Sequence, residues 1–306
     1  MDNIIQKDLF HEILTYQREN IDRAVNFQHD INEEQRLENS RKMAAFYQEI
    51  IKKLIEKYYQ EDSLPLFGNI MLSTINRCNG NCSFCGAAVS KDTRLPYTMS
   101  EELMNKILDE CHSLDYSGRI TMEGLNEPFL DGRMKYIVPH IKKKVPKSRI
   151  HIITNGIMLD TETLWHIYPY IEKIHINCYE DNYLDKIKNS ISYIKEKNKG
   201  SIEKIKFTVR KQTEILAQFG QNECGRSKME TLMCSCILPF NTLSVLPDGK
   251  VNLCISDLKA SYLLGDIHTE TLRSIWYGKK ADDYRKKIVG GRKELDLCKN
   301  CDMFCF

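Results

Sequence analysis

Hydrophobic positions along the chain change their spacing twice. Up to about residue 62 they recur at helical intervals, as at Ile50, Leu54 and Tyr58, and glycine and proline are absent. The pattern stops at a breaker that ends in Pro65. The sequence therefore predicts an N-terminal helical extension over residues 1–66.

Between residues 67 and 226, short runs rich in β-branched residues alternate with helical patterns. The runs typical of strands are 69–76, 119–122, 149–154, 173–178 and 203–209, and the helical patterns lie near 100–115, 132–144, 160–171 and 182–198. Such alternation predicts parallel strands joined by crossover helices. We expect an α/β fold, a partial (β/α)6 barrel, with active residues at the carboxyl ends of its strands.

The alternation ends after about residue 226. Residues 241–254 predict a β-hairpin whose turn is Pro247-Asp248-Gly249. A helical pattern around 269–289 and a cysteine-rich end follow. Residues 227–306 are therefore expected to form a small α+β domain.

Charge and cysteine content narrow the function classes. The 306 residues carry a formal net charge of +2, so we do not expect a nucleic-acid partner. No apolar run is long enough to span a bilayer and no signal peptide is visible, so we expect a cytoplasmic location and no membrane partner. Twelve cysteines in a reducing compartment point to metal or redox chemistry.

Three cysteines follow the first predicted strand, namely Cys78, Cys82 and Cys85. Three thiolates can hold three irons of a [4Fe–4S] cube and leave the fourth iron open for a cofactor. The alternative is a zinc knuckle, but structural zinc usually takes four ligands, and this loop offers neither a histidine nor a fourth cysteine. The loop is therefore interpreted as an iron–sulfur site.

The CxxxCxxC spacing, with Phe84 before the last cysteine, resembles the radical S-adenosylmethionine (SAM) superfamily. The resemblance implies that SAM chelates the open iron, and that reduction of the cluster cleaves SAM to a 5′-deoxyadenosyl radical, which abstracts a substrate hydrogen. It also implies an external electron donor such as flavodoxin or ferredoxin.

Later strand ends carry further matches. Glu127, in the segment Glu123 to Pro128, resembles the family's Gly-Glu-Pro segment and is expected to contact the SAM ammonium group, with Glu123 as a weaker substitute. Asn155 and Gly156 resemble a segment near the SAM ribose. Arg210 ends the fifth predicted strand, where a guanidinium could pair with the SAM carboxylate or a substrate anion.

A second cysteine group spans the hairpin and the C-terminal end. Its members are Cys236, Cys254, Cys298 and Cys301. Four thiolates suit a second cube or a tetrahedral zinc ion. The segment resembles the SPASM and shorter twitch domains of radical SAM enzymes, especially 2-deoxy-scyllo-inosamine dehydrogenases, which implies an auxiliary [4Fe–4S] cluster.

Other cysteines remain unassigned by these patterns. Cys234 is an alternative cluster ligand, and the role of Cys305 stays open. Cys224 follows the last strand region and could return a hydrogen atom to a substrate radical, but free cysteine is often a small buried hydrophobe. Arg210 and Cys224 are the catalytic candidates.

The leading functional hypothesis is a radical SAM oxidoreductase that oxidises an alcohol of a sugar or aminocyclitol-like small molecule. A radical epimerase, or a SPASM-type maturase of a ribosomal peptide or protein, is the second enzyme hypothesis. A zinc or iron–sulfur scaffold that binds a partner is the non-enzyme alternative. The sequence leaves the identity of the substrate open.

Overall fold

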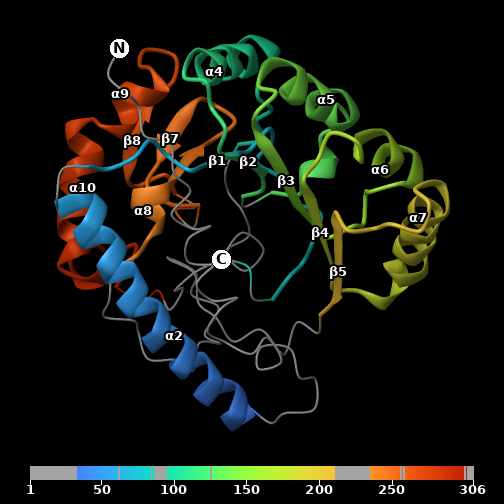
Figure 1. Cartoon of the computed structure of the whole chain (residues 1–306), viewed down its shortest axis with the longest axis horizontal. Coiled ribbons are helices and arrows are strands. Elements are labelled where there is room, and N and C mark those ends of the chain that lie inside the picture. Colours follow the sequence, from blue (N-terminus) through green and yellow to red (C-terminus); the bar gives the residue numbers. More distant parts are fainter. Residues whose placement is uncertain are drawn as a thin grey trace.

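The computed structural model describes residues 33–60, 63–83, 85, 95–124, 126–210, 235–255, 257, 259–299 and 301. Its centre is one eight-stranded sheet with the order β5-β4-β3-β2-β1-β6-β7-β8 (Figure 1). Five parallel strands begin it: β1 (Asn69–Leu72), β2 (Arg119–Met122), β3 (Arg149–Thr154), β4 (Lys173–Cys178) and β5 (Ile205–Val209). The predicted series of parallel strands is thus confirmed.

Helices cover one face of these parallel strands. They are α4 (Glu101–Ser113), α5 (Met134–Lys144), α6 (Thr161–Ile167) and α7 (Leu184–Lys197), and Figure 1 shows them on the outer side of the curved sheet. The Ser100 hydroxyl accepts a hydrogen bond from the Leu103 amide, which is the predicted cap of α4. Short 3-10 turns, η3 (Pro128–Leu130) and η4 (Asp181–Tyr183), follow β2 and β4.

The sheet continues into the C-terminal half of the chain. Strand β6 (Thr242–Val245) lies parallel to β1, and β7 (Lys250–Asn252) and β8 (Leu263–Asp266) extend it antiparallel. Gly249 in the predicted turn has a φ of +83°, and a Cβ there would lie 2.9 Å from His268 Nε2, so this position requires glycine. The predicted hairpin is confirmed.

Short helices complete this half: α8 (Leu238–Asn241), α9 (Leu272–Trp276), α10 (Lys279–Val289) and the 3-10 turn η6 (Arg292–Glu294). The single helix predicted around 269–289 was wrong, because it is two helices. Gly278 adopts an extended conformation (φ −69°, ψ 157°) and begins α10. A Cβ on Gly278 would lie 2.7 Å from the Ser274 carbonyl oxygen, so the chain turns tightly here.

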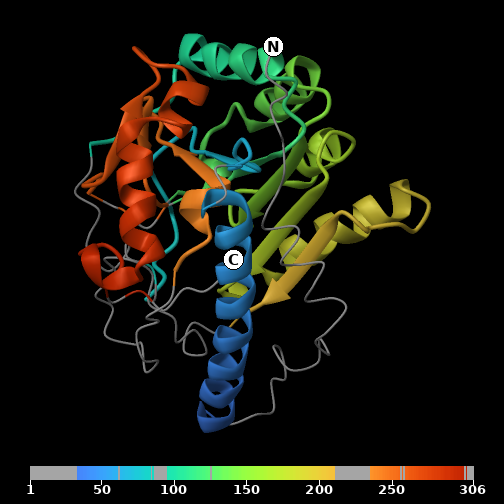
Figure 2. The ribbon, with the colours of Figure 1, turned by 60° about the vertical axis from the view of Figure 1, so that its left-hand side comes forward.

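The N-terminal extension is helical where the structure describes it. It consists of α2 (Glu33–Ile55) and one π-helical turn, η2 (Glu56–Gln60), whose end lies beside α8 and α10 in both views (Figures 1 and 2). The Tyr59 hydroxyl donates to Asp282 Oδ1 at 2.6 Å, and its ring packs edge-on against Phe240. Trp276 Nε1 donates to the Pro65 carbonyl at 2.9 Å. These contacts join the extension to the C-terminal half.

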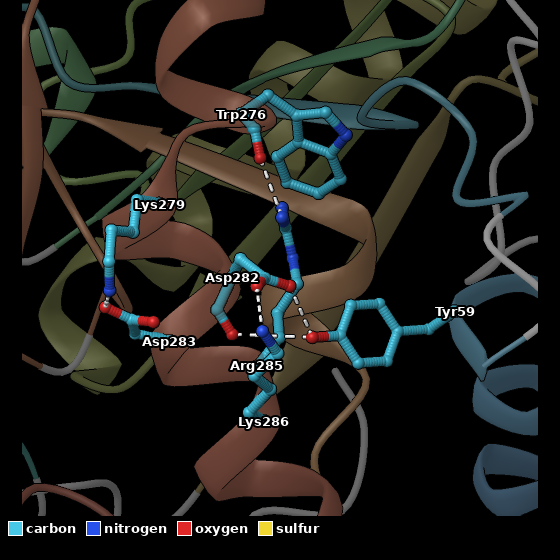
Figure 3. Close-up of polar contacts among 7 residues, drawn as sticks. All are labelled: Tyr59, Trp276, Lys279, Asp282, Asp283, Arg285 and Lys286. Carbon is cyan, nitrogen blue, oxygen red and sulfur yellow. Dashed lines mark hydrogen bonds and ion pairs between the residues drawn. The ribbon is translucent and has the colours of Figure 1, made fainter.

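The buried residue Arg285 lies at this junction, near Trp276 and Tyr59 (Figure 3). Arg285 Nη1 donates to the Trp276 carbonyl at 2.7 Å, and its guanidinium lies 4.2 Å from the centre of the Trp276 ring. Burial lowers the pKa of Arg285 to about 10, while Tyr59 and Asp282 oppose that shift. No helix among the described residues is long and apolar enough to cross a membrane.

Candidate active site

The loop after β1 carries the first cysteine group. Its stem is fixed by Asn76, whose side chain donates to the Leu95 carbonyl at 2.7 Å and accepts from the Tyr97 amide at 2.8 Å. The loop therefore starts from a fixed base at the carboxyl end of β1, where the sequence placed it.

Gly80 lies between the thiols of this loop. A Cβ at Gly80 would lie 3.4 Å from Cys82 Sγ and 3.5 Å from Cys78 Sγ, and the Gly80 amide donates to Cys78 Sγ at 3.3 Å. Burial raises the pKa of Cys78, and it raises that of Cys82 to about 12, with Cys85 adding to both shifts. The three thiols therefore lie close together, and iron binding would displace their protons.

Glu127 connects the ends of β2 and β3. Its carboxylate accepts hydrogen bonds from Thr154 Oγ1 (2.6 Å), the Phe129 amide (3.1 Å) and the Asn155 amide (2.8 Å). Its own amide donates to the Arg77 carbonyl beside the cysteine loop. Burial raises the pKa of Glu127, and the three hydrogen bonds oppose that shift. A carboxylate offers about four acceptor positions, so one remains for a ligand.

Asn155 links the third strand to the cysteine loop. Its side-chain nitrogen donates to Asn79 Oδ1 at 2.9 Å and lies 4.0 Å from Cys78 Sγ. Gly156 has a φ of +78°, and a Cβ there would lie 2.8 Å from Ile176. The Asn-Gly pair predicted from the sequence therefore reaches the cysteines because Gly156 permits a turn that other residues would obstruct.

The loop after β4 closes the other side of the site. A small cavity is lined by Gly80, Cys82, Asn155, Ile157, Cys178, Tyr179, Glu180 and Tyr183. Burial raises the pKa of Tyr179 to about 12, the three cysteines add to this shift and Arg210 opposes it. Arg210 therefore lies near the tyrosine, and its amide donates to the Cys178 carbonyl at 2.9 Å.

The residues present fit a cofactor that bears an ammonium group. Asn126 Oδ1 is buried and has no hydrogen-bond partner among the described residues. It precedes Glu127, whose carboxylate has one acceptor position left for a ligand.

The sequence did not predict Tyr179 as a site residue. Its position directly after a predicted strand was the only signal that could have identified it. Phe84 and Cys224 lie outside the described residues.

Three cysteines of the second group, Cys236, Cys298 and Cys301, lie close together. Burial raises the pKa of Cys298 to about 12, and Cys236 and Cys301 contribute to that shift. Cys254 follows β7, and its carbonyl accepts from the side chain of Asn252 at 2.8 Å. These positions suit a shared cluster.

Two buried charged residues surround this second group. Arg292 is 1% exposed, and its Nη1 donates to the Cys301 carbonyl at 3.0 Å. Asp257 accepts from the amides of Ser261 and Tyr262. No sequence pattern singled out Arg292, since its partner is a backbone atom nine residues away.

No three histidine, cysteine, aspartate or glutamate side chains among the described residues are grouped so that they could hold a single metal ion. In a cube each thiolate binds its own iron, so the ligands need not converge on one point. Cys234 and Cys305 lie outside the described residues.

Comparison with known proteins identifies two matching family models. The radical SAM superfamily model matches residues 72–196, and the SPASM model, an iron–sulfur cluster-binding domain, matches residues 234–302. The S-adenosyl-L-methionine-dependent 2-deoxy-scyllo-inosamine dehydrogenase of Niallia circulans is 26% identical over 243 residues, which cover 78% of this chain and 93% of the relative.

Two solved structures share the fold. The crystal structure of BtrN in complex with AdoMet and 2-DOIA superposes with a TM-score of 0.65 at 24% identity, covering 78% of this chain and 94% of BtrN. The structure of anSMEcpe with bound AdoMet gives a TM-score of 0.52 at 14% identity, covering 79% and 87%. The cysteine loop at the carboxyl end of β1 lies in the segment that matches the radical SAM superfamily model, and the second cysteine group lies in the segment that matches the SPASM model. The residues present at both places are of the kind that such domains use to hold iron–sulfur clusters and SAM.

Proposed function

We propose that this enzyme oxidises a secondary alcohol of a cyclitol or sugar-like small molecule to a ketone. The observation that carries the proposal is the second thiol group, Cys236 with Cys298 and Cys301. This group belongs to the C-terminal half of the chain, whose strands continue the same sheet as β1, the strand that precedes the SAM-cluster loop. Its relative from Niallia circulans is a dehydrogenase of 2-deoxy-scyllo-inosamine, and the two proteins align over most of their lengths.

The proposal assigns each site residue a role. Cys78, Cys82 and Cys85 hold the SAM cluster, and Phe84 takes part in binding the cofactor. Glu127, Asn155 and Gly156 bind SAM, and Arg210 binds SAM or substrate. Cys236, Cys254, Cys298 and Cys301 hold the auxiliary cluster. The domains proposed are 1–66, 67–226 and 227–306, and the proposed location is the cytoplasm.

When bound, SAM and the two clusters supply a hydrogen-abstracting 5′-deoxyadenosyl radical and an acceptor for one substrate electron. The hydroxyl proton must also pass to a general base or to solvent water. Arg210, which lies close to Tyr179, is proposed to lower the pKa of the bound hydroxyl by its positive charge. An external donor such as flavodoxin or ferredoxin provides the electron that starts each turnover.

The test is a turnover assay with cyclitols and sugars deuterated at their alcohol carbons. The holoenzyme, with SAM and a reductant under anaerobic conditions, should move deuterium into 5′-deoxyadenosine and yield a ketone detectable by mass spectrometry. The same assay in deuterated water separates oxidation from epimerisation. Solvent deuterium at an inverted carbon without ketone would contradict the proposal, as would the absence of ketone from every substrate.

A further inference from the structure

Glu123 directly follows β2, at the end of the sheet where the cysteine loop lies. Helices α4–α7 cover the convex side of the parallel strands (Figure 1), and Ile120 and Met122 of β2 are buried in that core. Because strand side chains alternate between faces, Arg119, Thr121 and Glu123 point to the opposite, concave side. Glu123 therefore faces the side of the sheet that these helices leave uncovered.

Contacts with the segment after β1 fix the position of Glu123. Ser73 Oγ donates to the Glu123 carbonyl at 3.3 Å, and a Cβ on Gly124 would lie 2.5 Å from the same hydroxyl, so glycine permits this close approach. A few residues later, the Glu127 amide donates to the Arg77 carbonyl at 2.8 Å. The loop after β2 is thus attached at both ends to the segment that leads into the cysteine loop.

The carboxylate of Glu123 has no hydrogen-bond or ion-pair partner in the part of the chain that the structure describes, and Arg119 acts on it by charge. Glu127, four residues later, accepts three hydrogen bonds. Glu123 is also partly exposed. Of the two carboxylates on this loop, Glu127 is largely occupied by the protein, whereas Glu123 can accept a proton from a bound molecule.

The surroundings of Glu123 make it the group that changes charge near neutral pH. Burial raises its pKa to about 7, and the charge of Arg119 opposes that shift. On the concave side of β3 lie Arg149 and His151, with Glu172 Oε1 at 3.5 Å from His151 Nε2, whereas β1 contains no charged or titratable residue. Burial lowers the pKa of His151 to about 4, so this imidazole is neutral at pH 7.

Strand register places Glu123 and Arg210 at opposite ends of one row of the concave side. The position on β3 next to Glu123 is Ile153, which pairs with His175 on β4. Arg210, at the end of β5, acts on the pKa of His175 by its charge. Adjacent strands are about 4.8 Å apart, so β2 and β5 are separated by about 14 Å along the sheet. A six-membered ring bound on this side can therefore lie between the two residues.

We propose that Glu123 is the general base that takes the hydroxyl proton during oxidation of the alcohol. After hydrogen abstraction the substrate carbon holds one unpaired electron and still carries its hydroxyl group. The O–H bond breaks, the proton bonds to a carboxylate oxygen of Glu123, and the electron pair stays on the substrate oxygen. Loss of one electron to an oxidised iron–sulfur cluster then leaves the C=O bond. The inference rests on the proposed function and adds the base that this function requires.

The test compares Glu123→Gln with the wild-type holoenzyme under anaerobic conditions, with SAM, a reductant and the deuterated cyclitols and sugars of the turnover assay, 2-deoxy-scyllo-inosamine among them. Glutamine keeps the shape of the side chain and removes the proton acceptor. Ketone formation should fall roughly 100-fold or more, the scale of a general-base contribution. Deuterium should still enter 5′-deoxyadenosine, because hydrogen abstraction does not use the base. Glu123→Asp keeps a carboxylate and should recover part of the loss.

Two further measurements separate a base from a residue that only supports the fold. The wild-type rate of ketone formation should rise with pH through a midpoint near 7, because the base acts when deprotonated, and Glu123→Gln should lack that rise. Infrared difference spectra of the substrate-free holoenzyme should show a protonated carboxyl group that titrates near pH 7 and is missing from the glutamine variant. Calorimetric titration should give the same SAM affinity in all variants.

Glu162→Gln is the matched control, because Glu162 is an exposed residue of α6 on the convex side, and it should leave every readout unchanged. Ketone formed by Glu123→Gln at the wild-type rate and with the wild-type pH profile would overturn the inference while the proposed function stands. Weaker SAM binding in Glu123→Gln would also overturn it, because Glu123 would then be a SAM ligand. Absence of ketone from the wild-type enzyme with every substrate would instead count against the proposed function.

Discussion

At the scale of single residues, Glu127 shows how a buried carboxylate can organise a cofactor site. It is 2% exposed and ties together the ends of two strands and the backbone of the cysteine loop. Burial raises the pKa of Glu127, and the three donors from which it accepts oppose that shift. The SAM ammonium group would then meet a carboxyl group that is held in a fixed orientation.

Glu127→Gln should weaken SAM binding by about 1–3 kcal/mol, the scale of a hydrogen bond to a charged group. The glutamine amide has no negative charge. Its NH2 group would also face atoms that donate hydrogen bonds to the carboxylate in the wild-type protein, so at least one of those bonds is lost. Calorimetric titration of SAM measures the change, and Glu196→Gln on the exposed side of α7 is the control. Unchanged affinity in the Glu127 variant would exclude it from the SAM site.

At the scale of elements, the N-terminal extension is connected to the C-terminal half by few but specific contacts. Tyr59 on η2 donates to Asp282, and Lys286 pairs with the same carboxylate at 2.6 Å (Figure 3). The tyrosine pKa is raised by burial and by Asp282, so the hydroxyl keeps its proton and remains a donor.

Tyr59→Phe should therefore lower the free energy of unfolding by about 1–2 kcal/mol, because Asp282 loses a partly buried donor while the ring contact with Phe240 remains. Tyr136→Phe on α5 is the control, since Tyr136 is 64% exposed. Thermal unfolding of the two holoenzymes measures the difference. Equal melting temperatures for both variants would show that the Tyr59 hydrogen bond contributes nothing to docking of the extension.

Elements with a strong local pattern could be predicted from the sequence, and contacts between elements could not. The strand at 119–122 could be predicted from its β-branched residues. The cap at Ser100 could be predicted from a hydroxyl side chain that directly precedes two acidic residues in the first turn of a helix. The break at Gly278 escaped prediction, because a single glycine within a helical pattern is often tolerated. The hydrogen bond from Thr154 to Glu127 depends on how β2 and β3 are aligned, and no local pattern encodes that.

At the scale of the whole molecule, one sheet carries both cysteine groups. The first group follows β1, and Cys236 and Cys254 flank the hairpin whose strand β6 pairs with β1, with Leu72 beside Val245. The sequence predicted the two sites separately, since both are encoded by spacing. It did not predict that the hairpin would join the parallel strands directly, and this pairing fixes the two sites relative to each other.

This arrangement makes the two sites separable by mutation. Replacing Cys298 and Cys301 by alanine should remove about four irons per chain and abolish ketone formation, while SAM cleavage to 5′-deoxyadenosine continues, because the first thiol group lies on a different loop. Cys111→Ala is the control, since Cys111 is buried in α4 and should leave both products unchanged.

Metal ligation can contribute folding energy, so circular dichroism must first show that the double variant retains its secondary structure. If it does, continued SAM cleavage without ketone assigns electron removal to the second cluster, because hydrogen abstraction alone leaves a substrate radical that must still lose one electron and one proton to become the ketone. Ketone formed at the wild-type rate would show that the radical passes its electron elsewhere, and that the second cysteine group serves the fold alone.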